Sequence, residues 1–263
     1  MDLAGATVLV TGASSGIGAA IARHASEAGA VVALAARRVD LLEQLAAEIG
    51  GSAHGVDLAD PDQLDGFIAR VEAVVGPIDV LVNNAGLEAS GLMEEADEAR
   101  IVELVAVNLV APQRLVRQVL PGMLARGRGH LVAMSSLAGV AAVPGAAVYS
   151  STKAGLSHFT ACVARDLVGT SIGTTLVEPG PVVSEMWERF SADPTLAAAL
   201  ARGRKLQLFP PISVDAVAAA TVRGVLEGRR HVRLPRRLTA QYALENAPRR
   251  LTDLVMVGLR PRR

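Results

Sequence analysis

The sequence contains one cysteine, Cys162, among 263 residues, and aromatic side chains make up only 3% of it. A lone cysteine excludes a disulfide within the chain and a cysteine-rich zinc site, and we interpret Cys162 as a small packed residue rather than a nucleophile. The five histidines are scattered without the spacing of metal ligands, so no metal is expected. With so few aromatic residues, the core must consist mainly of Ala, Val and Leu.

Long uncharged apolar runs are also missing. No stretch reaches the roughly 18 residues expected of a membrane-spanning helix. The first residues contain Asp2 and no basic segment, which argues against a secretory signal, so a cytoplasmic location is expected. The formal net charge is zero, so the overall charge gives no indication of a nucleic-acid partner.

Positive charge is nevertheless concentrated at one end of the chain. Residues 228–263 carry ten Arg and two acidic residues, an excess of eight positive charges. Apolar residues recur beside these Arg at helical spacing, at Leu251, Leu254, Val255 and Leu259. We interpret residues 235–263 as a basic amphipathic tail that is solvated or covers a neighbouring subunit. The alternative is a weak peripheral contact with anionic lipid.

Short apolar segments alternate along the chain with longer amphipathic ones, which predicts strands alternating with helices. Strands are expected at residues 6–10, 31–35, 53–56, 80–82, 131–134, 173–177 and 231–234. Helices are expected at residues 16–28, 41–49, 61–75, 97–125, 148–168 and 213–226, with Asp60 capping the third and a bend near Pro112 in the fourth. This alternation predicts β-α-β crossovers and hence an α/β fold, a doubly wound parallel sheet with helices on both faces.

No Ser/Gly linker or internal repeat divides the chain, so we interpret residues 1–234 as one domain. Within it, residues 184–212 combine apolar side chains such as Trp187 and Phe209 with three prolines. This segment is predicted to form a mobile cover over a substrate.

A glycine-rich turn follows the first expected strand and opens a helix. Gly12 permits a tight exit from the strand, Gly16 lets a ligand approach the backbone, and Gly18 lets helix and sheet pack closely. The exposed N–H groups at the helix start suit a pyrophosphate, and the predicted binding residues are Gly12, Ser14, Ser15, Gly16, Ile17 and Gly18. The spacing is not G-x-G-x-x-G, so a plain β-α turn is the alternative.

The second expected strand leads into two arginines. A carboxylate at the end of this strand would accept a hydrogen bond from the ribose 2′-hydroxyl of NAD and would repel a 2′-phosphate. Here Ala36 provides no carboxylate, and Arg37 and Arg38 follow it. Because Arg binds phosphate through paired, charge-assisted hydrogen bonds, this favours NADP(H) over NAD(H). The alternative is a pair of ordinary surface arginines.

Tyr149 and Lys153 lie four residues apart in an expected helix, which puts both side chains on one face. A free phenol titrates near pH ~10. A cation held beside it favours the phenolate, so Lys153 is expected to lower the pKa of Tyr149. This spacing alone is weak evidence, because such pairs occur by chance in many helices.

Together with Asn83-Asn84-Ala85-Gly86 after the fourth expected strand, these motifs are in the order found in one family. From about Thr7 to about Ile212, the chain resembles the short-chain dehydrogenase/reductase family. The resemblance implies a single Rossmann-type domain with a seven-stranded parallel sheet, and a homo-oligomer, either a dimer or a tetramer. It also implies a nicotinamide cofactor and the oxidation of an alcohol or the reduction of a carbonyl.

The resemblance also assigns roles to particular residues. Tyr149 matches the general acid–base, and Lys153 matches the residue that binds the nicotinamide ribose and depresses the Tyr pKa. Ser136 matches the donor to the substrate oxygen, and its neighbour Ser135 is interpreted as structural or in contact with the cofactor. Asn108 matches the helix-kinking residue that positions a water in the proton relay. Further cofactor contacts are implied at Asp57, Leu58, Asn84, Ala85, Gly86, Pro179, Gly180, Val182 and Ser184, the last standing where the family usually has Thr.

The sequence therefore predicts an oxidoreductase that transfers a hydride between NADP(H) and a small-molecule carbonyl or secondary alcohol, with a hydrophobic substrate favoured by the apolar cover. Two alternatives remain. One is a dinucleotide-binding sensor or scaffold protein that is catalytically weak. The other is a membrane-associated reductase of lipid-like carbonyl substrates that docks through the basic tail.

Overall fold

The computed structural model describes residues 1–184, 187–188, 191–205 and 210–235. They form one seven-stranded sheet in the order β3-β2-β1-β4-β5-β6-β7, and every neighbouring pair of strands is parallel. The strands are β1 Thr7–Thr11, β2 Val31–Ala36, β3 Ser52–Gly55, β4 Val80–Asn83, β5 Gly129–Met134, β6 Ile172–Pro179 and β7 His231–Leu234. The expected doubly wound fold is confirmed.

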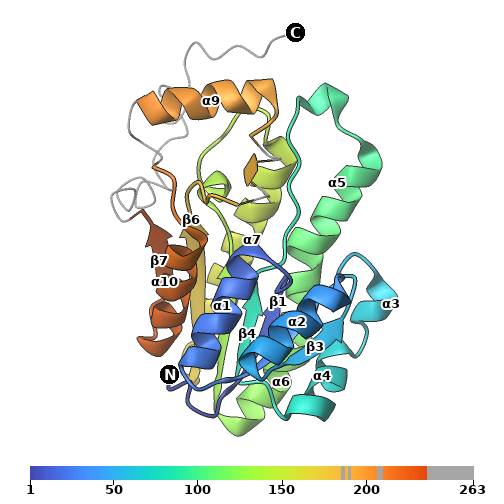
Figure 1. The fold of residues 1–263 in the computed structure, drawn as a ribbon, viewed down its shortest axis with the longest axis vertical. Coiled ribbons are helices and arrows are strands. Elements are labelled where there is room, and N and C mark those ends of the chain that lie inside the picture. Colours follow the sequence, from blue (N-terminus) through green and yellow to red (C-terminus); the bar gives the residue numbers. More distant parts are fainter. Residues whose placement is uncertain (185–186, 189–190, 206–209, 236–263) are drawn as a thin grey trace.

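The helices cover both faces of this sheet (Figure 1). On one face, Ile21, Leu42 and Val217 bring α1, α2 and α10 into a common core with the strands. On the other face, Phe67 and Leu115 do the same for α4 and α6. The helices are α1 Gly16–Glu27, α2 Val39–Ile49, α3 Pro61–Leu64, α4 Phe67–Val75, α5 Glu98–Val105, α6 Ala111–Arg126, α7 Ala147–Asp166, α9 Pro194–Lys205 and α10 Val214–Leu226.

The strand order reverses between β1 and β4, because the chain first builds outward to β3 and then returns to the other side of β1. At such a point the turns that leave the two neighbouring strands diverge and leave a crevice at their carboxyl ends. The glycine-rich turn follows β1, and the Asn84-Ala85-Gly86 segment follows β4. Both predicted nucleotide motifs therefore meet at this crevice.

The helix predicted for residues 61–75 is wrong in one respect, because the structure divides it into α3 and α4. Asp60 caps α3 as expected, and its Oδ1 accepts hydrogen bonds from the N–H groups of Asp62 (2.9 Å) and Gln63 (3.3 Å). The break falls at Gly66, whose φ of 61° lies in the left-handed region that glycine tolerates.

The helix predicted for residues 97–125 also consists of separate pieces. Between α5 and α6, residues 106–110 form a turn of π-helix, in which the Ala111 N–H donates to the Ala106 carbonyl. This irregular turn lies just before Pro112, where a bend is expected, and the proline occupies the first turn of α6. Pro112 has no N–H to donate to the carbonyl of Asn108, four residues earlier, and this lost bond favours the wide turn.

The predicted cover at residues 184–212 is described in part. It contains α9, and a bridge between Val182 and Ile212 ties its two ends together. The predicted tail, residues 235–263, lies outside the described residues apart from Pro235, so the division at residue 234 stays a prediction. Among the described helices, none is both long enough and apolar enough to cross a membrane.

Candidate active site

A cavity of about 490 Å³ extends along the crevice from the glycine-rich turn to α7. This volume lies within the roughly 300–1,000 Å³ typical of small-molecule sites. Two of the predicted site residues, Gly18 and Asn108, do not line the cavity. The others do, namely Gly12, Ser14, Ser15, Gly16, Ile17, Arg37, Arg38, Asp57, Leu58, Asn84, Ala85, Gly86, Ser136, Tyr149, Lys153, Pro179, Gly180, Val182 and Ser184.

The glycine-rich turn packs so tightly that two of its glycines admit no side chain. A Cβ on Gly12, which has a φ of 66°, would lie 2.7 Å from the Ala85 Cα. A Cβ on Gly18 would lie 2.3 Å from the Gly12 carbonyl oxygen. Gly16 differs, because a Cβ there would meet nothing within 4 Å among the described atoms. Gly18 therefore shapes the turn from behind, while Gly16 leaves the helix start open to a ligand.

Asn84 connects this turn to the end of β4. Its side-chain amide donates to the carbonyls of Thr11 (2.9 Å) and Gly12 (3.3 Å). The Thr11 hydroxyl in turn accepts from the backbone N–H groups of Asn84 (3.0 Å) and Ala85 (3.1 Å). The predicted cofactor residue Asn84 thus also holds the two halves of the crevice in register.

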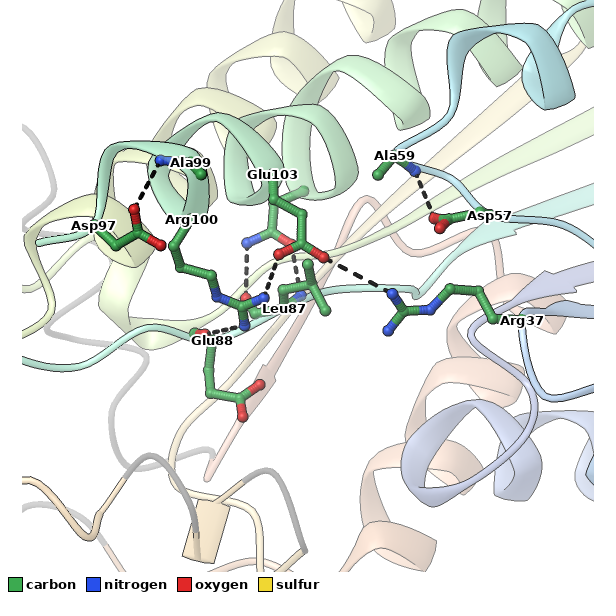
Figure 2. Close-up of polar contacts among 10 residues, drawn as sticks. Arg37, Asp57, Ala59, Leu87, Glu88, Asp97, Ala99, Arg100 and Glu103 are labelled. Atoms are coloured by element: carbon green, nitrogen blue, oxygen red, sulfur yellow. Dashed lines mark hydrogen bonds and ion pairs between the residues drawn. The ribbon is translucent and has the colours of Figure 1, made fainter.

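The two arginines that follow β2 are held by different partners. Arg38 donates to the hydroxyl of Ser14, at 3.0 Å from Nη2 and 3.2 Å from Nε, and to that of Ser15 at 2.6 Å. Arg37 extends toward α5, and its Nη1 lies 3.8 Å from Oε1 of Glu103 on that helix (Figure 2). Asp57 lies nearby and accepts the Ala59 N–H at 2.9 Å. Glu103 was not among the predicted site residues.

Asn108 is fully buried inside the π-helical turn. Its Oδ1 accepts the Leu87 N–H at 2.7 Å, and its Nδ2 donates to the Leu87 carbonyl at 2.9 Å and to the Thr152 hydroxyl at 3.1 Å. A Cβ on Gly86 would lie 3.2 Å from the Lys153 Nζ and 3.4 Å from the Asn108 Oδ1. Asn108 therefore acts on the cavity indirectly, by fixing the loop after β4 next to α7.

Tyr149 and Lys153 share one face of α7, as the four-residue spacing predicts. The Lys153 Nζ lies 5.7 Å from the centroid of the Tyr149 ring and donates to the Met134 carbonyl at 2.9 Å. Lys153 is only 4% exposed. The fold thus holds a buried ammonium beside a phenol at the cavity wall.

The expected depression of the Tyr149 pKa by Lys153 is wrong for this structure. Burial raises the pKa of the phenol to about 12, a hydrogen bond with the Ser136 side chain opposes this, and the negative charge of Glu88 adds to it. Burial also lowers the pKa of Lys153 to about 8. The protein packed around each group thus sets the direction of its pKa shift, and at neutral pH the phenol retains its proton.

The paired serines after β5 divide their tasks. Ser135 is buried, donates to the Lys153 carbonyl at 3.0 Å and contacts the Ser157 hydroxyl at 2.7 Å, so it joins β5 to α7. Ser136 lines the cavity, hydrogen-bonds to the Tyr149 side chain and accepts the Ala138 N–H at 3.1 Å. These contacts agree with a structural role for Ser135, and because Ser135 also lines the cavity, its contact with a cofactor stays a prediction.

The far end of the cavity has apolar walls. Of these walls, only the cover segment is expected from the sequence. Trp187, expected in the cover, and Tyr149 both pack against a cluster that contains Leu196 of α9. The segment between β5 and α7 also lines the cavity. Its lining residues belong to no sequence motif, and they are Leu137, Ala138, Ala141 and Val143. Glu88 also lines the cavity and was missed, although its position just after Asn84-Ala85-Gly86 was a usable signal.

Comparison with known proteins gives a consistent result. A family model described as short chain dehydrogenase matches residues 6–195. The ketoacyl reductase HetN of Nostoc sp. is 40% identical over 185 residues, which cover 68% of this chain and 64% of that protein. A fatty acyl-CoA reductase of Mycobacterium tuberculosis is 33% identical over 254 residues, which cover 87% of this chain and 86% of that protein.

Solved structures give the same likeness. A short-chain dehydrogenase from Streptomyces avermitilis superposes with a TM-score of 0.80 at 32% identity, covering 97% of both chains. One from Sphingobium yanoikuyae, in complex with NADPH, has a TM-score of 0.79 at 29% identity and covers 94% of this chain and 95% of its own. One from Burkholderia phymatum, in complex with NAD, has a TM-score of 0.79 at 25% identity and covers 93% and 94%.

Proposed function

This chain belongs to the short-chain dehydrogenase/reductase family, and from that membership we propose that it transfers a hydride between NADP(H) and an apolar carbonyl compound or secondary alcohol. One observation carries the proposal. The side chains of Ser136, Tyr149 and Lys153 meet at one wall of a cavity that continues to the glycine-rich turn. The groups that would transfer the proton and the turn that would bind the pyrophosphate thus line one cavity.

The residues present fit a nicotinamide dinucleotide. The open helix start at Gly16 suits the pyrophosphate, and the cavity beyond it is long enough to reach Tyr149. At the adenosine end, Ala36 offers no carboxylate for a 2′-hydroxyl, and Arg37 and Arg38 supply positive charge for a 2′-phosphate. The similar proteins include one in complex with NADPH and one in complex with NAD, so this arginine pair is the support for NADP(H).

The protein residues orient the substrate and move the proton. When bound, NADPH supplies the hydride that reduces the carbonyl carbon. Tyr149 is protonated at neutral pH, because its pKa is raised to about 12, and it donates this proton to the carbonyl oxygen. The Ser136 hydroxyl, which lies within hydrogen-bonding reach of the phenol, steadies the negative charge that develops on the same oxygen.

Lys153 and Asn108 support this transfer from behind the phenol. When Tyr149 gives up its proton, the buried Lys153 ammonium beside it stabilises the phenolate. Lys153 also lines the cavity, where it would hold the ribose of a bound nicotinamide nucleotide. Asn108 keeps Leu87 and Thr152 in place, so that the loop after β4 and α7 hold a constant separation.

The apolar walls indicate the kind of substrate. Trp187, Leu196 and Leu200 of the cover segment, with Leu137 and Val143, surround the space beside Tyr149. Such a surface gains free energy from burying aliphatic parts of a ligand. The names of two relatives, a ketoacyl reductase and a fatty acyl-CoA reductase, accord with a carbonyl compound that carries an acyl chain.

The proposal is tested by replacing the phenol. In Tyr149→Phe, we expect reduction of aliphatic carbonyl compounds to fall by at least about a hundredfold, because proton donation is lost, whereas NADPH still binds. Turnover is measured as the loss of NADPH absorbance, and binding as NADPH fluorescence. Ser151→Ala is the matched control, since it removes an exposed hydroxyl from the same helix.

Unchanged turnover in Tyr149→Phe would remove the phenol from the mechanism. A wild-type protein that binds NADPH but reduces no member of a carbonyl panel would instead favour the sensor or scaffold alternative.

A further inference from the structure

We propose that Glu103 on α5 sets the preference between NADPH and NADH, because it competes with the ribose 2′-phosphate for Arg37. The inference rests on the proposed use of a nicotinamide dinucleotide. It adds a specificity-determining residue that belongs to no sequence motif. This residue lies on α5, across the crevice from the end of β2.

The ion pair joins the end of β2 to α5 beside the part of the cavity proposed to hold the adenosine. Arg37 follows β2 and lines the cavity, whereas Glu103 belongs to α5, and Figure 2 shows the guanidinium reaching toward that helix. The Nη1 of Arg37 lies 3.8 Å from Oε1 of Glu103. Arg37 is thus directed toward a carboxylate in the same region where a 2′-phosphate would need it.

Arg100 prevents Glu103 from turning away. Its Nη1 lies 2.6 Å from Oε2 of Glu103, and its Nη2 donates to the Glu88 carbonyl at 2.7 Å. The two oxygens of Glu103 are therefore divided between Arg100 and Arg37. With one oxygen held by Arg100, the other is directed at Arg37.

Arg38 does not share this partner. It donates to the hydroxyls of Ser14 and Ser15 in the glycine-rich turn, on the pyrophosphate side. Of the two arginines, only Arg37 has the Glu103 carboxylate among its described contacts.

The charge of the ligand decides which nucleotide Glu103 disfavours. A 2′-phosphate carries close to two negative charges at neutral pH, so Glu103 both repels it and neutralises part of the Arg37 charge that attracts it. The 2′-hydroxyl of NADH is uncharged and experiences neither effect. Glu103 is about one third exposed, so water weakens the interaction without abolishing it.

The test is to remove the charge and keep the shape. In Glu103→Gln, we expect the Kd for NADPH to fall by about three- to tenfold, while the Kd for NADH changes by less than about twofold. Both constants are measured by nucleotide fluorescence at low ionic strength. The matched control is Glu98→Gln, which removes the same charge from the exposed first turn of α5 and should leave the ratio of the two constants unchanged.

A double-mutant cycle identifies the route of the effect. Arg37→Met should weaken NADPH binding, and in that background Glu103→Gln should alter the NADPH Kd by less than about twofold. Glu103→Asp, which keeps the charge but withdraws it from Arg37 by one methylene, should give a smaller shift in the same direction. This variant also provides a test if Glu103→Gln fails to fold.

Weaker NADPH binding in Glu103→Gln, or equal shifts for both nucleotides, would overturn the inference and make Glu103 a support that orients Arg37. An effect that persists in the Arg37→Met background would overturn it as well. Failure of the proposed use of a nicotinamide dinucleotide has a different signature, because the wild-type protein would then bind neither NADPH nor NADH. A protein that binds both nucleotides but reduces no carbonyl would refute the proposed hydride transfer and leave the role of Glu103 intact.

Discussion

Tyr149 and Lys153 respond in opposite directions to the loss of surrounding water. Burial favours the uncharged form of each group, so it raises the pKa of the phenol to about 12 and lowers the pKa of the ammonium to about 8. At neutral pH the pair is therefore a neutral proton donor beside a cation. This state suits reduction, in which the phenol gives up its proton.

We expect the pH dependence of reduction to follow Lys153. Below about pH 8 the ammonium is charged and supports the phenolate formed during proton transfer, so kcat should be level. Above about pH 8 the ammonium loses its proton, and kcat should fall by up to about tenfold per unit. The measurement is kcat against pH at saturating NADPH, and a level profile up to pH 10 would contradict it.

A substitution at Glu88 provides a second test of the raised pKa of Tyr149. The negative charge of Glu88 contributes to the raised pKa of Tyr149, so Glu88→Gln should lower that pKa. Alcohol oxidation needs the phenolate, and its rate at a fixed pH between 7 and 9 should therefore rise, on the order of threefold for half a pKa unit. Oxidation is followed as the appearance of NADPH absorbance, with Glu98→Gln as the control for a distant charge of the same sign.

The spacing of Tyr149 and Lys153 was sufficient to predict that they share a helix face, because that depends only on helical geometry. The direction of the Tyr149 pKa shift was not predictable in this way. It depends on how much protein surrounds the phenol, and the surrounding groups, including Glu88, come from segments far from α7 in the sequence.

Among the elements, the π-helical turn between α5 and α6 has the largest effect on the site, because it contains Asn108. It buries Asn108, which then forms three hydrogen bonds to Leu87 and Thr152. Pro112, in the next turn, removes a bond that a regular helix would make to the Asn108 carbonyl. The helix irregularity therefore links the loop after β4 to the helix that carries Tyr149.

Asn108→Ala should lower both stability and activity. Leaving the Leu87 N–H and carbonyl without their side-chain partner is expected to cost about 2 kcal/mol, and kcat should fall because the loop no longer holds its place beside α7. Thermal unfolding and NADPH consumption measure the two effects. The matched control is Gln118→Ala, whose amide joins α6 to the Ile68 N–H (3.2 Å) and the Leu64 carbonyl (2.8 Å) away from the cavity.

Gln118→Ala should therefore lose stability while its kcat stays near the wild-type value. Equal loss of kcat in the two variants would mean that activity follows stability alone, and it would withdraw the positioning role from Asn108.

The sheet as a whole depends on contacts between neighbouring strands, and His130 lies in one of them. This residue of β5 is 3% exposed, and its Nε2 lies 2.7 Å from the hydroxyl of Thr175 on β6. A Cβ on Gly173 would lie 2.3 Å from its Nδ1, so a glycine there makes room for the ring. Burial lowers the pKa of His130 to about 4.

Stability should accordingly decrease in acid. Because the pKa is about 4 in the folded state and near 6.5 in the unfolded state, the unfolded chain binds the extra proton between these values. The contribution is present in full above about pH 6.5 and is lost as the pH falls toward 4, by about 3 kcal/mol in total. Urea unfolding between pH 4.5 and 7.5 measures it.

His130→Gln should show a shallower loss of stability over this range than the wild type. His158→Gln, which changes an exposed histidine on α7, is the matched control and should retain the wild-type slope. If the His130→Gln slope equals that of the wild type, the acid sensitivity has another origin.

The sequence by itself determined the alternation of strands and helices, the nucleotide motifs and the family, because these depend on residue type and on spacing along the chain. It missed the break at Gly66, since a single glycine also fits a continuous helix and only the packing of α3 and α4 distinguishes the two outcomes. It also missed Glu103 and Glu88, whose side chains carry no motif.

Only the tertiary structure brought Arg37 and Glu103 to opposite sides of one crevice, gathered the apolar walls beside Tyr149 and packed protein around the phenol. The physical reason is common to all three. Burial and ion pairing depend on distances through space between segments remote in sequence, and the sheet order sets those distances.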